Sequence, residues 1–173
     1  VADNIDPYTM NHSQLVALLS QPESTELDWK AAIPKGLNGP NSDLNWDMSR
    51  AEMLRDLASI ANSLIRENGY LIYGVKDLGS SRNVIGISKQ LDDADLQQWS
   101  ENHFDPPIRF EFSLISIDSS MVGAVEIFPD PGRPHVVART LGSAIFEGQV
   151  WFRRGTKNTI ALRADLARFF VRP

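Results

Sequence analysis

The stretch LASIANSLIRENGYLIYGVKD, residues 57–77, decides the fold because a helical pattern passes within it into a buried strand. Upstream, Ser49 is followed three residues later by Glu52, a capping-box pattern, and apolar residues then recur at helical spacing. This pattern predicts a helix over about residues 50–66. The short apolar run YLIYGV (70–75) is rich in aromatic and β-branched residues and predicts a buried strand.

The pattern on either side of this stretch predicts further strands and helices around it. Alternating and helical apolar spacings are separated by clusters of Gly, Pro, Asn and Asp, which mark the connections. The predicted elements are a helix near 12–20, a strand at 27–30, a loop at 35–47, a strand at 84–87, a helix at 92–103, a hairpin of 108–117 with 121–128, strands within 135–140 and 149–155, and a helix at 161–170.

This order of elements predicts an α+β fold, with a single mixed, mostly antiparallel sheet and helices packed on it. A chain of 173 residues suits one such domain. We therefore expect a short N-terminal tail over residues 1–10 and one domain over residues 11–173.

Composition excludes several classes of site. The chain has no cysteine, which rules out disulfides, thiolate catalysis and Cys-ligated metals, and its three histidines do not share a helix-face metal spacing. No apolar run approaches the roughly 20 residues that span a bilayer, and the acidic, polar start does not resemble a signal peptide. We expect a cytoplasmic protein with no membrane partner.

Charge is distributed unevenly along the chain. Residues 1–130 carry 9 Lys and Arg against 20 Asp and Glu, a net charge of −11, whereas residues 131–173 carry 8 against 2, a net charge of +6. A basic C-terminal quarter on an acidic body can present a local positive surface to nucleic acid. The alternative is a solvated helix face with a few salt bridges.

Residues 74–80, GVKDLGS, have the glycine spacing of a phosphate-binding P-loop but lack its lysine. The lysine and the backbone amides together hold the phosphates in such a loop. We therefore expect neither ATP binding nor ATP hydrolysis.

Carboxylates gather near the first predicted strand, where ESTELDWK contains Glu23 and Asp28, and Asp77 follows the second strand. If the two strands are neighbours, Asp28 and Asp77 converge. Carboxylate oxygens are the ligands that Mg²⁺ or Mn²⁺ prefers, and such an ion can activate water against a phosphodiester. Since Glu23 and Asp28 lie about 17 Å apart on a straight strand, they share a metal only if the chain bends. The alternative is a set of surface carboxylates.

The segment VWFRRGTKN, residues 150–158, contains two arginines before a turn. Arg153, Arg154 and Lys157, with the Thr156 hydroxyl and the turn amides, are groups that bind phosphate. Arg133 and Lys30 are further candidate contacts. The alternative is a strand end with solvated arginines.

Four segments in order resemble the Schlafen-type AlbA-like domain. ESTELDWK resembles the family's E-S-x-x-x-E-F-K strand, and residues 57–77 resemble its A-N-T-x-G-G-x-x-x-x-G-V-x-D stretch. VIGI follows at the expected place, and PHVV and VWFRRGTKN resemble the late P-H/Y-x-x and y-x-R-x-G-S/T elements. The four segments span roughly residues 20–170.

This resemblance implies a compact mixed α/β fold and a role in handling nucleic acid. Some Schlafen proteins are endoribonucleases that cut structured RNA such as transfer RNA, and their metal-binding acidic triad corresponds here to Glu23, Asp28 and Asp77. Asp28 replaces the family's usual Glu, and the turn before the G-V-x-D strand is about three residues longer here.

Three hypotheses follow for the function. The first is a nucleic-acid-binding domain, for DNA or RNA, that contacts the phosphate backbone through its basic C-terminal edge. The second is an endonuclease acting on RNA or single-stranded DNA, in which Glu23, Asp28 and Asp77 hold Mg²⁺ or Mn²⁺ and Lys30 or Arg153 stabilises the charge on phosphorus. The third is a protein-interaction or oligomerisation module of a larger regulatory protein.

Overall fold

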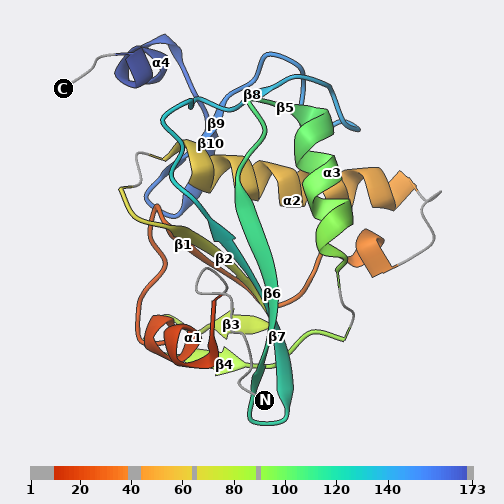
Figure 1. Cartoon of the computed structure of the whole chain (residues 1–173), viewed down its shortest axis with the longest axis vertical. Coiled ribbons are helices and arrows are strands. Elements are labelled where there is room, and N and C mark those ends of the chain that lie inside the picture. Colours follow the sequence, from red (N-terminus) through yellow and green to blue (C-terminus); the bar gives the residue numbers. More distant parts are fainter. Residues whose placement is uncertain (1–9, 39–43, 64–65, 89–90, 171–173) are drawn as a thin grey trace, which may run out of the picture.

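A computed structural model describes residues 10–38, 44–63, 66–88 and 91–170 of the chain (Figure 1). The helices are α1 His12–Leu18, the 3-10 helix η1 Lys35–Asn38, α2 Leu44–Asn62, α3 Asp93–His103 and α4 Arg163–Phe170. The strands are β1 Leu27–Lys30, β2 Gly69–Tyr73, β3 Val75–Asp77, β4 Arg82–Val84, β5 Phe104–Asp105, β6 Phe110–Ile117, β7 Ser120–Ile127, β8 Val136–Val137, β9 Trp151–Arg154 and β10 Lys157–Ile160.

The central sheet has four strands in the order β1-β2-β7-β6. β1 runs parallel to β2, and β7 pairs antiparallel with both β2 and β6. Three two-stranded sheets, β3-β4, β5-β8 and β9-β10, surround it. The predicted α+β class with a mixed, mostly antiparallel sheet is therefore confirmed, although several of the strands lie outside the central sheet.

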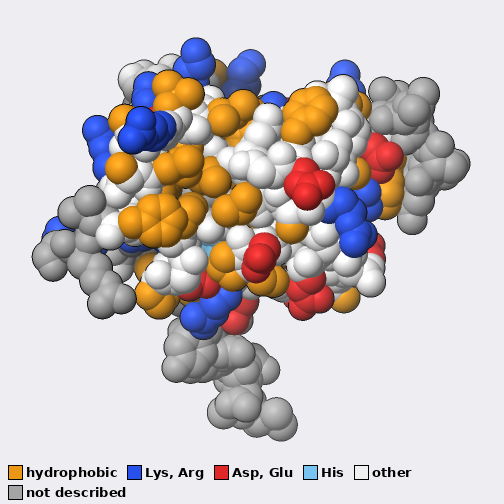
Figure 2. Space-filling view, turned by 90° about the horizontal axis from the view of Figure 1, so that it is seen from above, with side chains coloured by type: hydrophobic (Ala, Val, Ile, Leu, Met, Phe, Trp, Pro, Cys, Tyr) orange, Lys and Arg blue, Asp and Glu red, His pale blue; other side chains and the backbone are white. Residues whose placement is uncertain are grey.

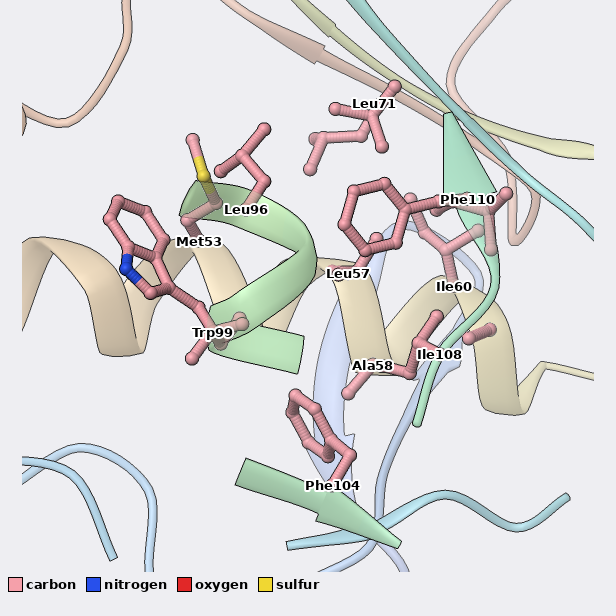
Figure 3. Packing of buried hydrophobic residues seen from close by; sticks show 14 of the residues in the cluster. Met53, Leu57, Ala58, Ile60, Leu71, Leu96, Trp99, Phe104, Ile108 and Phe110 are labelled. Carbon is pink, nitrogen blue, oxygen red and sulfur yellow. The ribbon is translucent and has the colours of Figure 1, made fainter. Parts of the chain in front are cut away.

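Side chains that alternate along the strands of the central sheet enter two hydrophobic clusters. Leu71 and Val125 belong to the cluster under α2 and α3, whereas their neighbours Ile72 and Ala124 belong to the cluster under α1. Successive side chains of a strand point to opposite faces of the sheet, and both faces of this sheet are covered by hydrophobic residues. Figure 3 shows the larger cluster, in which α2, α3 and the sheet contribute the labelled side chains.

The long helix α2 begins earlier than the capping-box pattern predicts. It starts at Leu44, so Ser49 lies inside it, and the buried Ser49 hydroxyl accepts a hydrogen bond from the Gly36 amide at 3.0 Å instead of capping the helix. Trp46 packs edge to face on Trp99 with ring centroids 5.8 Å apart, and the Arg50 guanidinium lies 4.0 Å from the Trp46 ring centre. These contacts stabilise the additional turns.

One short hairpin also differs from the prediction. The turn expected after YLIYGV contains β3, which pairs with β4, and the predicted strand at 84–87 is replaced by β4 at Arg82–Val84. Gly74 has a φ of 94°, and a Cβ built on it would lie 2.8 Å from the Gly86 backbone. The chain therefore bends sharply out of the central sheet at Gly74, a conformation that glycine tolerates.

The C-terminal end of α2 is fastened to the late strands by Asn62. Its amide nitrogen donates to the carbonyls of His135 at 3.0 Å and Trp151 at 2.9 Å, and its oxygen accepts from the His135 amide at 2.7 Å. The next residue, Ser63, accepts a hydrogen bond from the Arg153 amide at 3.1 Å. These bonds hold β9 beside α2 although β9 is not part of the central sheet.

We predict that Asn62→Ala lowers the free energy of unfolding by about 2–4 kcal/mol, because it leaves three buried backbone groups without partners. Urea denaturation followed by circular dichroism measures the change. The matched control is Asn83→Ala on the exposed edge of β4, which should change stability by less than about 0.5 kcal/mol. Equal effects of the two substitutions would show that Asn62 is not a clamp.

Candidate functional site

A network of buried ion pairs joins β1, α2 and β9. The Lys30 Nζ atom lies 3.0 Å from Asp28 Oδ2 and 3.0 Å from Asp56 Oδ2. Arg153 Nη1 lies 3.3 Å from the same Asp28 oxygen, and the Arg153 side chain is only 1% exposed. We call Glu23, Asp28, Lys30, Asp56 and Arg153 the buried charge network.

Strand geometry explains why Asp28 and Lys30 meet these partners. Residues two apart on a strand point to the same side, so both side chains leave β1 toward α2 and β9. Asp56 also accepts a hydrogen bond from the side-chain amide of Asn158, and Arg153 Nη2 donates to the Thr156 carbonyl at 2.8 Å. The network therefore fixes the β9-β10 hairpin against the first strand.

Two carboxyl groups of the network, those of Asp56 and Glu23, hold their protons more tightly than usual. Burial raises the pKa of Asp56 despite the attraction of Lys30, and burial together with the nearby Asp28 raises the pKa of Glu23. Burial opposes the charge on Lys30, but Asp56 and Asp28 outweigh it and raise the pKa of that ammonium group. Glu23 lies near Asp28, and its Oε1 atom accepts a hydrogen bond from the Trp29 backbone amide at 3.2 Å.

Asp77 does not join this group. It lies on β3, where its Oδ1 atom accepts the Gly79 amide at 2.7 Å and lies 3.4 Å from Arg82 Nε. Among the residues that the structure describes, no three His, Asp or Glu side chains are arranged to hold a metal ion. The proposed ligands Glu23, Asp28 and Asp77 thus do not fit Mg²⁺ or Mn²⁺ as a set, and metal-dependent cleavage stays a prediction.

Four exposed cations lie on β9, β10 and α4. The Arg154 side chain is 55% exposed and binds both carboxylate oxygens of Asp165, at 3.0 and 2.8 Å. Lys157 is exposed and is the register partner of Arg154 across the hairpin. Arg168 and Arg163 on α4 are exposed as well. We call Arg154, Lys157 and Arg168 the basic edge.

Asp165 has a second role at the start of α4. Its Oδ2 atom accepts the Leu162 amide at 2.9 Å, which satisfies a free backbone donor at the helix start. This hydrogen bond, with Arg154 beside it, lowers the pKa of Asp165. Asp165 therefore ties the orientation of Arg154 to the beginning of α4.

A pocket of about 400 Å³ opens beside Arg154. It lies where β9, α4, the end of α2 and the segment before β1 come together. Its lining residues are Thr25, Asn62, Ser63, Phe152, Arg153, Arg154, Asp165, Arg168 and Phe169.

The sequence profile of the family described as Schlafen, AlbA_2 matches residues 23–162, most of the chain. The chain belongs to the Schlafen AlbA_2 family. The match begins at Glu23 and contains the buried charge network, but it ends before α4. The resemblance seen in the sequence is thereby confirmed, and α4 lies outside the matched residues.

Two solved structures are similar to this AlbA_2 domain at low identity, and the first of them shares its fold. The crystal structure of the DIP2311 protein from Corynebacterium diphtheriae is 17% identical with a TM-score of 0.56, over 91% of this chain and 32% of DIP2311. The chain thus spans about a third of that protein. The solution structure of the N-terminal domain of a Nitrosomonas europaea protein, named as related to the ATP-dependent DNA helicase RecG, is 16% identical with a TM-score of 0.46, over 77% of this chain and 84% of that domain. No curated protein matches the chain.

The residues predicted together as phosphate contacts lie in different environments in the structure. Arg153 is buried in the charge network, Lys30 is half-buried there, and Arg133 is half-buried with its guanidinium 3.5 Å from the Ser63 carbonyl. Arg154, Thr156 and Lys157 are exposed. Arg153 was expected on an accessible strand end, but Asp28 on β1 and the Thr156 carbonyl draw it inward.

Sequence analysis missed Asp56, Arg168 and Phe169. Asp56 lies on the buried side of α2, and an aspartate within an apolar helical pattern is the signal that could have identified it.

No described helix is long and apolar enough to cross a membrane.

We predict that Arg153→Met destabilises the domain by about 3 kcal/mol, because it removes one partner of a buried ion pair. In an Asp28→Asn background the same substitution should cost about 1–3 kcal/mol less, since the charge it pairs with is gone. Urea denaturation of the four proteins of this double-mutant cycle measures the difference. Arg154→Met is the matched control and should cost under about 1 kcal/mol. Additive losses in the cycle would contradict the pairing.

We predict that Glu23→Gln changes the pH dependence of stability. The pKa of Glu23 is higher in the folded protein than in the unfolded chain, where it is about 4.3. The contribution of Glu23 to the free energy of unfolding is therefore complete below the pKa of the unfolded chain, and it is lost as the pH rises through the pKa of the folded protein. Glutamine does not ionise, so the variant does not lose this contribution. The free energy of unfolding of the variant should therefore rise relative to that of the wild type from pH 4 toward pH 7. Denaturant titrations at several pH values test this, and a relative stability that falls with pH would contradict it.

Proposed function

We propose that this chain binds nucleic acid by contacting the phosphate backbone through the basic edge. The observation that carries the proposal is the exposure of Arg154, Lys157 and Arg168 on adjoining elements. Guanidinium and ammonium groups neutralise phosphates and release condensed counterions, which provides affinity without sequence selectivity. The family resemblance supports the same role.

The surface around α4 supports this proposal. α4 lies at one end of the molecule in Figure 1, and Figure 2 looks onto that end. Blue Lys and Arg side chains gather there at the border of an apolar area, while the red acidic side chains of this face lie farther from α4. An acidic body with a local basic edge restricts contact with a polyanion to that edge.

The burial of Arg153 lowers the number of expected phosphate contacts. Arg154, Lys157 and Arg168 provide about three, so log affinity should fall with log salt concentration with a slope of about −2 to −3. Fluorescence anisotropy with a labelled oligonucleotide at 25 to 200 mM salt measures this slope. Failure to bind at the lowest salt concentration, or binding that does not depend on salt, would overturn the proposal.

We predict that the double variant Lys157→Ala with Arg168→Ala reduces the magnitude of the salt slope by about 1.5 to 2, because two phosphate contacts are lost. The matched control is Lys35→Ala with Lys76→Ala, which removes two exposed lysines elsewhere and changes the net charge equally. The control slope should stay unchanged. If the two double variants behave alike, the overall charge and not the basic edge governs binding.

A further inference from the structure

The pocket beside Arg154 has features that backbone binding does not require. Besides Arg154 and Arg168, it is lined by the benzene rings of Phe152 and Phe169 and by Thr25. Among the described residues, neither ring belongs to the two hydrophobic clusters of the core. Both rings are only partly exposed, and they offer apolar surface to the pocket.

Two polar side chains on the inner wall of the pocket, Asn62 and Ser63, are already used in contacts within the protein. The Asn62 amide is used by the His135 and Trp151 backbone, and the Ser63 hydroxyl donates to the Ser59 carbonyl at 2.8 Å and accepts from Arg153. The guanidinium of Arg153 faces Asp28. Among the described residues, the buried Arg153 Nε atom has no hydrogen-bond partner. The other side chains left to contact a ligand are the Phe152 and Phe169 rings and the exposed Arg154 and Arg168.

The two exposed arginines are placed beside the rings. Asp165 orients the Arg154 guanidinium, which also lies 5.3 Å from the centre of the Phe152 ring. Arg168 and Phe169 on α4 both line the pocket, so a phosphate held by Arg168 lies at the same pocket as the second ring. Two aromatic rings with exposed arginines beside them match a nucleotide, whose base is flat and apolar on its faces and whose phosphate is anionic.

We propose that this pocket takes an unstacked base of a single-stranded nucleic acid while the adjoining phosphates lie on the basic edge. The inference rests on the proposed function and adds the substrate class. A volume of about 400 Å³ falls within the range of small-ligand sites and has room for one base with its sugar. A base in a duplex is paired and stacked, and extruding it costs a few kcal/mol, so single strands are favoured.

The experiment compares a labelled single-stranded oligonucleotide with an abasic strand of the same length, whose sugars and phosphates are intact. With the full chain at 50 mM salt, fluorescence anisotropy should show about 5- to 150-fold tighter binding of the base-bearing strand, the gain from stacking one base. The duplex of the same sequence should bind more weakly than the single strand.

Substitutions at the second ring localise the effect. Phe169→Leu keeps an apolar side chain but removes the ring, and it should remove most of the gain for the base-bearing strand while leaving abasic binding unchanged. Phe170→Leu on the same helix is the matched control, because Phe170 is 74% exposed and does not line the pocket. Equal thermal unfolding of the two variants excludes a folding defect, and Thr25→Val provides a second variant if Phe169→Leu unfolds.

The outcomes separate this inference from the proposed function. Equal, salt-dependent binding of base-bearing and abasic strands overturns the base pocket but leaves backbone binding intact. Binding of neither strand at low salt overturns both. A free mononucleotide that competes as strongly as the strand overturns single-strand recognition, because the ligand would then be a nucleotide alone. Preference for the duplex also contradicts the inference.

Discussion

The contact between Asp28 and Arg153 is the constraint on which the functional face depends. Asp28 lies on the first strand and Arg153 on β9, more than a hundred residues later, and their atoms approach to 3.3 Å in a buried environment. The β9-β10 hairpin lies outside the central sheet, so few backbone bonds to that sheet position it. A buried charge left without its partner is costly, and this cost holds the hairpin in one place.

Two adjacent arginines on β9 face opposite sides of the strand. Arg153 points inward to the charge network, and Arg154 points outward to Asp165 and the pocket. The alternation that a strand imposes buries the inner residue and leaves its neighbour exposed. The Lys30 ammonium likewise lies between two carboxylates, where a cation from solution would otherwise be needed to balance their charge.

Much of this architecture could be predicted from the sequence because it follows local periodicity. The β6-β7 hairpin, α3 and the strand LDWK follow alternating or helical spacing, and their existence was predicted correctly. The start of α2 was not, because the Trp46 contact with Trp99 involves a helix 53 residues away in the chain. The site was hardest to predict: whether Arg153 faces Asp28 or solvent, and whether Asp77 approaches Asp28, depends on contacts between distant segments.

The pairing of Arg154 with Asp165 has a consequence for selectivity. Because Asp165 is part of the same chain, it competes with every incoming anion for Arg154 at a high effective concentration. A small monovalent anion offers one weak contact and cannot displace this carboxylate efficiently. If the basic edge binds nucleic acid as proposed, a polymer that presents several charges at once would displace it through the sum of its contacts, and the internal carboxylate would then select against small anions.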